Sequence, residues 1–73
     1  MNLPYTKLTF REMDTAVLSK LTYQPQSTAT ILKAVRAANP DQTITRERVL
    51  SALSRMHGGH LVRNIAPMFW QKI

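Results

Sequence analysis

The C-terminal third of the chain, residues 48–73, reads RVLSALSRMHGGHLVRNIAPMFWQKI and changes its hydrophobic period part-way along. Up to residue 57, the apolar side chains cluster on one side of a helical wheel: Val49, Leu50, Leu53 and Met56. Gly58 and Gly59 follow, and we expect them to close the helix in the left-handed conformation. The remainder is rich in β-branched and aromatic residues and is broken at Ala66-Pro67, which predicts a hairpin of two short strands.

Two further helices are predicted upstream. Apolar residues at spacings of three, four and seven predict a helix over residues 10–21, with Phe10 and Met13 on its apolar face. Thr9 and Glu12 have the spacing of a capping box at its start, and Asp14 is a rival N-cap. A second helix is predicted over residues 28–38, because an apolar stripe there follows a serine suited to capping and precedes Asn39-Pro40.

The third helix, residues 46–57, has the clearest start. Thr45 is a good N-cap, and Ile44 and Val49 have the spacing of a hydrophobic staple around it. The chain of 73 residues therefore divides into an N-terminal arm, residues 1–8, and one small domain, residues 9–73. Leu3 and Tyr5 would anchor the arm on the domain.

Composition narrows the classes of protein that the chain can represent. It has no cysteine, which excludes a disulfide scaffold, a thiolate metal site and a cysteine nucleophile. No apolar run approaches the roughly 20 residues that span a bilayer, and the first ten residues lack the pattern of a secretory signal. We therefore expect a cytoplasmic protein, associated with the nucleoid if the source is prokaryotic.

The order of the predicted elements, three helices and then a hairpin, resembles that of the winged helix-turn-helix domain. Residues 48–73 are similar to the recognition helix, the small-residue break, a Leu-Val-Arg strand and a short wing returning through an aromatic pair. MDTAVLSKL and STATILKAVRAA, residues 13–21 and 27–38, are similar to the first two helices. The resemblance covers residues 9–73 and implies a mainly α fold with a small β-hairpin and a DNA-binding role.

Two positions depart from the family pattern. The turn between the second and third helices, residues 39–44, is longer than in the simplest helix-turn-helix. His60 stands just before the Leu-Val pair, where glycine is usual. We expect the two preceding glycines to supply the backbone freedom in its place.

The charge of the chain agrees with a nucleic-acid partner. The formal net charge is +6 and the sequence pI is about 10.6. Residues 46–73 carry five of the ten Lys and Arg residues but one of the four acids, which places +4 of the +6 on the third helix and the hairpin. This concentration favours double-stranded DNA over a protein partner.

The polar face of the third helix supplies the expected DNA contacts. Arg48, Ser51 and Arg55 are predicted to point outward into the major groove, where a guanidinium can make a bidentate contact to guanine. Further contacts are expected from Arg46 at the start of this helix and from Ser54 on its flank. They are also expected from Lys33 and Arg36 on the preceding helix, from Thr43 in the loop, and from Arg63 and Asn64 on the hairpin.

The hairpin supports an alternative function. Both faces of its last strand carry large apolar groups, so one face needs a cover. The cover would come from the arm, from a second subunit in a homodimer on two half-sites, or from another protein. The expected interface residues are Tyr5, Phe69, Trp70 and Ile73. In that alternative the chain is a protein-interaction module, such as a phage or plasmid adaptor or inhibitor; RNA binding is a third hypothesis.

Catalysis and metal binding are not expected. His57 and His60 have no third nitrogen, thiolate or carboxylate nearby in the sequence, and we expect them to interact with the end of the third helix. The four acids are too scattered to form a carboxylate pair, and no nucleophilic triad is evident. We therefore expect no metal, no cofactor and no enzymatic activity.

Overall fold

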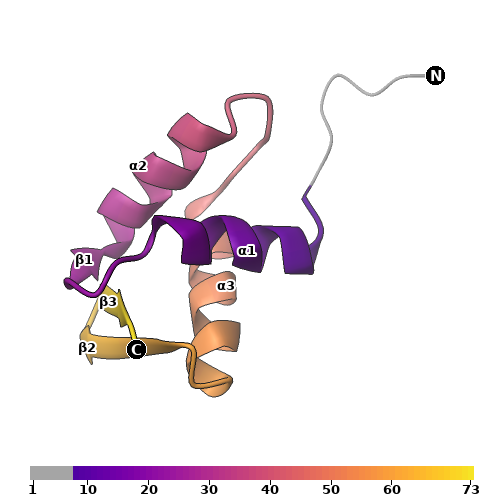
Figure 1. Cartoon of the computed structure of the whole chain (residues 1–73). Helices are drawn as coiled ribbons and strands as arrows, with labels where there is room; N and C mark the ends of the chain where they lie inside the picture. The colour runs from indigo at the N-terminus through magenta and orange to yellow at the C-terminus, as the bar shows by residue number, and fades with distance from the viewer. Residues whose placement is uncertain (1–7) are drawn as a thin grey trace.

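The structure is a computed structural model that describes residues 8–73. Three helices come first and are followed by a hairpin, which confirms the predicted class of fold, mainly helical with a small sheet in a winged-helix-like layout (Figure 1). The elements in chain order are α1 (Phe10–Lys20), β1 (Gln26–Ser27), α2 (Thr28–Ala38), α3 (Arg46–Gly58), β2 (Val62–Ala66) and β3 (Phe69–Lys72). Tyr5 and Leu3, the expected anchors of the arm, lie outside the described residues.

Each helix begins at the predicted cap. At α1 the Glu12 amide donates to Thr9 Oγ1 at 3.1 Å, and Glu12 Oε1 accepts from the Thr9 amide at 2.8 Å, which is the full capping box. The hydrogen bond from the Thr9 backbone holds the pKa of Glu12 below its ordinary value, and the Thr9 side chain adds to the effect. Ser27 caps α2 with a side-chain oxygen that accepts from the Thr30 amide, and Thr45 caps α3 with one that accepts from the Arg48 amide.

The three helices enclose one core. Most of its fully buried side chains come from one stripe of each helix: Met13 and Val17, Ile31 and Val35, and Val49, Ala52 and Leu53. Val62 of β2 is also fully buried and belongs to the same core. Phe10 was expected on this stripe, and that expectation is wrong, because its ring is 72% exposed. It is the first residue of α1, and its ring lies over the Arg55 guanidinium of α3 instead of entering the core. Leu8, just before α1, is partly buried and packs against the core.

The hairpin belongs to a three-stranded antiparallel sheet with the order β1-β3-β2. β1 pairs Gln26 with Trp70 and Ser27 with Phe69. The sequence pattern does not predict this strand, because two residues show no alternation of their own and one of them also caps α2. The pairing of β2 with β3 is interrupted at Ile65, which leaves a bulge next to the turn at Ala66-Pro67.

A series of buried hydrogen bonds connects the hairpin to the start of α2. The Trp70 indole N–H donates to Thr28 Oγ1 at 2.9 Å, and that hydroxyl in turn donates to the Met68 carbonyl at 3.2 Å. The Thr28 amide donates to the same carbonyl at 2.8 Å. Thr28 is 1% exposed and Trp70 is 8% exposed, so the indole belongs to the core. The expectation that Trp70 forms part of an exposed interface is therefore wrong.

The end of α3 differs from the expected glycine closure. Gly58 is the last helical residue and Gly59 has a φ of −88°, so neither adopts the left-handed conformation. His60 adopts it, with a φ of 61°. Its amide donates to the His57 carbonyl at 3.1 Å, and the Leu61 amide donates to the Met56 carbonyl at 2.9 Å, which is the pattern of a Schellman motif. His60 thus fills the position that most helices give to glycine.

This geometry makes the stability of the domain sensitive to residue 60. We expect His60→Gly to raise the free energy of unfolding by up to about 1 kcal/mol, because glycine has no Cβ to clash at a positive φ. His60→Val should lower it by about 1 to 2 kcal/mol, because a β-branched residue is the least tolerant of that conformation. Urea titrations followed by circular dichroism measure both variants. Equal stability of the Gly and Val variants would contradict the assignment.

Candidate nucleic-acid interface

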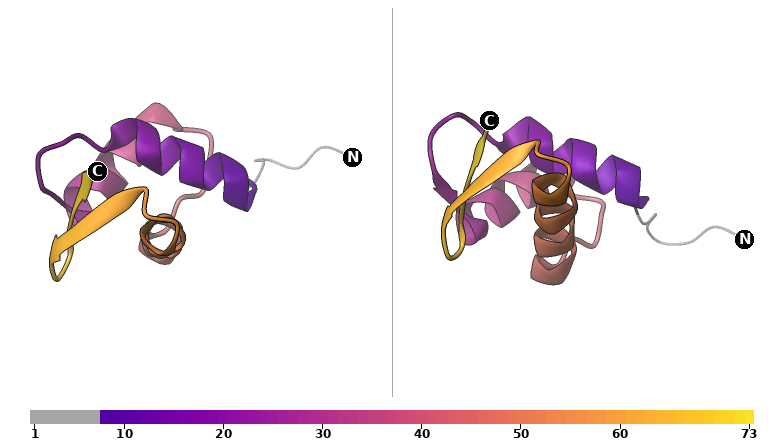
Figure 2. Two further views of the ribbon diagram at one scale, coloured as in Figure 1. Left: turned by 60° about the horizontal axis from the view of Figure 1, so that its bottom comes forward. Right: turned by 90° about the horizontal axis from the view of Figure 1, so that it is seen from below.

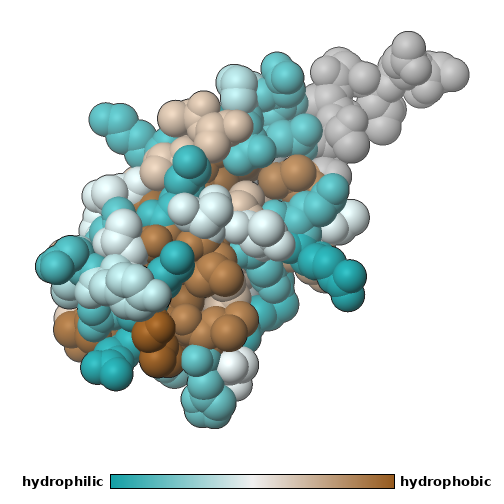
Figure 3. Space-filling model, viewed as in Figure 1, coloured by the Kyte–Doolittle hydropathy of each residue, from teal (hydrophilic) through white to brown (hydrophobic). Residues whose placement is uncertain are grey.

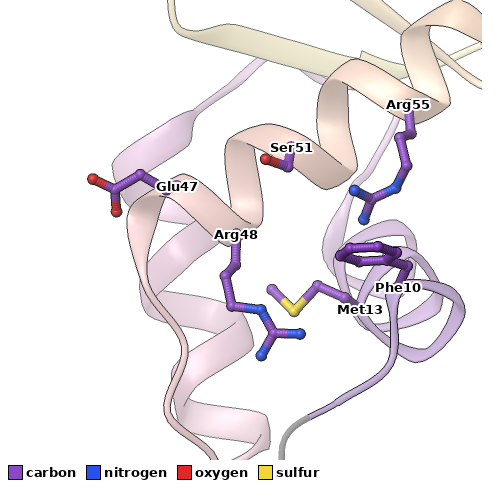
Figure 4. A pocket seen from close by; sticks show the side chains of 6 residues that line it. All are labelled: Phe10, Met13, Glu47, Arg48, Ser51 and Arg55. Carbon is purple, nitrogen blue, oxygen red and sulfur yellow. The ribbon is translucent and has the colours of Figure 1, made fainter.

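The two arginines expected to point outward from α3 do not do so. Arg48 and Arg55 both reach sideways toward the first half of α1, while Glu47 points away from it (Figure 4). They are seven positions apart, which is two helical turns, so they share one flank of α3. α1 lies across that flank, and the hairpin lies on the other side of α3 (Figure 2). The prediction of groove-facing guanidiniums at these two positions is corrected accordingly.

Arg55 is held by a carboxylate and an aromatic ring. Its Nη2 lies 2.6 Å from Asp14 Oδ1, and its Nε lies 3.1 Å and 3.3 Å from the two carboxylate oxygens. The guanidinium carbon lies 4.7 Å from the centre of the Phe10 ring. About a third of each charged side chain is exposed, so the ion pair is partly screened by water. Asp14, expected as a rival cap, has this role instead.

Arg48 is held by the backbone. Its Nη2 donates to the carbonyl of Leu8, just before α1 begins. Its Nη1 is buried and has no hydrogen-bond partner among residues 8–73. No carboxylate in this part of the chain pairs with it. A guanidinium that is half-buried and lacks a counter-charge is unusual, because desolvating a charge without an acceptor is costly.

The exposed ridge of α3 is therefore formed by other residues. Glu47, Ser51 and Ser54 lie opposite the buried stripe, and all three are exposed. Arg46 begins the helix and is also exposed, and its Nη2 lies 3.5 Å from the Met68 sulfur at the hairpin turn. Ser51 and Ser54 thus occupy outward positions as expected, while Arg46 is the cation of α3 that remains at the open surface beside the hairpin.

The contacts expected from α2 and its following loop are partly available. Lys33 is exposed on α2, and Thr43 is exposed in the loop. Arg36 is exposed as well, but its Nε donates to the Ile44 carbonyl at 2.9 Å, which ties the end of α2 to the residue before the α3 cap. Arg36 consequently positions the loop that leads into α3, and its outer nitrogens remain at the surface.

The two hairpin residues have different roles. Arg63 is exposed on β2. The Asn64 amide nitrogen donates to the carbonyls of Ala66 and Phe69, both at 2.9 Å, and so holds the hairpin turn closed. We therefore correct the expectation for Asn64, because its side-chain donor is engaged in the turn and does not face a partner.

The hairpin exposes several large apolar side chains. Phe69 is 44% exposed and Ile73 is 59% exposed, so both expected interface residues outside the core are at the surface. Leu61 and Ile65 on the same hairpin are also exposed and were not predicted. Figure 3 shows hydrophobic surface in the lower half of the view, where the hairpin and the end of the chain lie.

Other kinds of site find no support in the described part of the chain. Residues 8–73 contain no group of three side chains able to hold a metal ion. None of the helices formed by these residues is long and apolar enough to cross a membrane. Comparisons with known proteins give no matching family, no matching curated protein and no matching solved structure.

The attachment of Arg55 to α1 predicts energetic coupling between two helices. A double-mutant cycle of Asp14→Ala and Arg55→Ala should give an interaction free energy of about 0.5 to 1 kcal/mol, because the pair is close but partly solvated. Chemical denaturation of the four proteins at low salt measures it. A matched cycle of Asp14→Ala with Arg63→Ala should give no coupling. Additive effects in the first cycle would contradict the contact.

Proposed function

We propose that the chain binds double-stranded DNA and acts as a small transcriptional regulator in the cytoplasm. In this proposal the ridge of α3 enters the major groove, and the hairpin is a short wing beside it. A helix about 10 to 12 Å across fits a groove about 12 Å wide. The observation that carries the proposal is the exposure of Arg46, Lys33 and Arg63, three cations on three elements of a winged-helix-like layout.

The distribution of charge supports this orientation. Residues 26–73 contain seven Lys and Arg residues and two acids, a net charge of +5. Residues 8–25, which include α1, contain two of each and are neutral. The helix that covers the flank of α3 thus adds no net charge, and the positive potential belongs to α2, α3 and the hairpin. A polyanion would approach from that side.

The contacts within the proposed interface divide into two kinds. Arg46, Lys33 and Arg63 would neutralise phosphates, which fixes the register of the protein on the duplex without reading sequence. Ser51 and Ser54 would be able to reach base edges from α3. Arg48 and Arg55 would contribute indirectly, by fixing how α3 sits against α1.

The salt dependence of binding tests this proposal. Binding to a mixed-sequence DNA duplex should weaken with added salt with a log-log slope of roughly −3, about −0.9 for each of three phosphates neutralised. Arg46→Ala should make that slope shallower by about 0.9. Arg11→Ala, which removes the same charge from the exposed surface of α1, is the matched control and should leave the slope unchanged.

Fluorescence anisotropy with a labelled duplex measures these slopes. A flat salt response, or equal effects of the Arg46 and Arg11 variants, would contradict the proposed interface. Duplex RNA of the same sequence provides the comparison for the RNA hypothesis, because its major groove is too deep and narrow for side chains to read. Tighter binding to that RNA would reject the DNA assignment.

The apolar face of the hairpin favours a second candidate function, binding of an acidic protein partner. Four exposed apolar side chains lie there: Leu61, Ile65, Phe69 and Ile73. Arg63 and Lys72 are on the same hairpin, and residues 48–73 contain no acid. A partner with apolar residues and negative charge would complement both properties. A chain with this function would not need to bind duplex DNA, so a flat salt response in the titration favours it.

A further inference from the structure

We propose that the pocket between α1 and α3 binds a small organic monocarboxylate through Arg48. The pocket has a volume of about 110 Å³ and is lined by the residues of Figure 4: Phe10, Met13, Glu47, Arg48, Ser51 and Arg55. The pocket shares Glu47 and Ser51 with the exposed ridge of α3, but its contact to the anion would come from Arg48, which the proposed function does not place on DNA. The inference therefore does not depend on DNA binding.

Among residues 8–73, the positive charge of Arg48 has no counter-charge. Of the four acids, Glu12 accepts the Thr9 amide in the capping box and Asp14 pairs with Arg55. Glu47 points away from the pocket (Figure 4). The fourth acid, Asp41, is exposed in the loop after α2.

Residues 1–7 contain no acidic side chain either, so an anion that pairs with Arg48 would come from outside the chain. The buried Nη1 of Arg48 has no acceptor among residues 8–73. A rotation of the guanidinium into the pocket would give this donor an acceptor and would relieve the cost of leaving it unpaired.

The wall of the pocket combines apolar surface, a hydroxyl and one uncompensated positive charge. Phe10 and Met13 provide apolar surface, and Ser51 contributes a hydroxyl that can donate to an anion. The charge of Arg55 is already balanced by Asp14, which leaves one positive charge for the ligand. A single carboxylate matches one uncompensated guanidinium, whereas a dianionic phosphate would bring a second, unbalanced negative charge.

The size of the pocket sets the dimensions of the ligand. A volume of 110 Å³ equals about four water molecules at roughly 30 Å³ each, enough for a carboxylate and part of one ring. A shallower hollow adjoins it and is lined by Leu8, Thr9, Phe10 and Arg48. The apolar end of a ligand can extend over Phe10 into that hollow. Benzoate has this shape and charge, and we take it as the probe.

Titration of the intact chain with benzoate, followed by amide chemical shifts in NMR, tests the site. We expect saturable shifts at Phe10, Arg48 and Ser51. Benzamide, which has the same shape without the charge, should bind about tenfold or more weakly, because a charge-assisted hydrogen bond is lost. Arg48→Gln should weaken benzoate binding by a similar factor, while Arg63→Gln, the matched loss of an exposed cation, should leave it unchanged.

Two further measurements test the site independently of the Arg48 variant. Ser51→Leu fills the pocket from an exposed helical position and leaves Arg48 in place, so it should abolish the benzoate shifts even if the Arg48 variant does not fold. Inorganic phosphate should bind more weakly than benzoate. Equal binding of benzoate and benzamide, unchanged binding to the Ser51→Leu protein, or tighter binding of phosphate would overturn the proposal.

Discussion

The packing of α3 against α1 through two arginines is the interaction on which the arrangement of the surface depends. Arg55 reaches Asp14 and the Phe10 ring, and Arg48 reaches the Leu8 carbonyl. The two contacts of Arg55 are each modest, because surface ion pairs and cation–π contacts contribute about 0.5 to 1 kcal/mol. Together they cover one flank of α3 and leave its ridge of Glu47, Ser51 and Ser54 open.

A second constraint fixes the hairpin. The chain of hydrogen bonds from Trp70 through Thr28 to the Met68 carbonyl buries the indole and holds the hairpin turn at the start of α2. The turn is therefore docked on the helical body. Arg46 lies beside this turn, so the first residue of α3 and the hairpin share one edge of the surface. The proposed contact with DNA uses that edge.

Most of the fold could be predicted from the sequence, because hydrophobic spacing and capping residues act locally. Thr9, Ser27 and Thr45 cap the helices as expected, and the break at Ala66-Pro67 separates the two strands of the hairpin. β1 was missed because its two residues form a strand only by pairing with β3. His60 was misjudged because sequence alone does not say which residue after a helix takes the positive φ.

The candidate site was predicted less well, for a physical reason. A helical wheel gives the angle of a side chain around its own axis, but it does not say which neighbouring helix covers that angle. Arg48 and Arg55 are polar residues off the buried stripe, and the sequence of α3 does not distinguish them from Ser51 or Ser54. The position of Arg55 is determined by Asp14 and Phe10 on α1, which are about forty residues away from it along the chain.

In the proposed complex, DNA meets Arg46 and Arg63, while Arg55 keeps its contact with α1 and Arg48 keeps its contact with the Leu8 carbonyl just before α1. The arginine side-chain Nε–H signals, followed by NMR during titration with a DNA duplex, test it most directly. The account predicts that the signals of Arg46 and Arg63 move with added DNA, and that Arg55 keeps its cross-relaxation to the Phe10 ring throughout. If Arg48 and Arg55 instead left α1 and their signals moved with DNA, the account would be wrong.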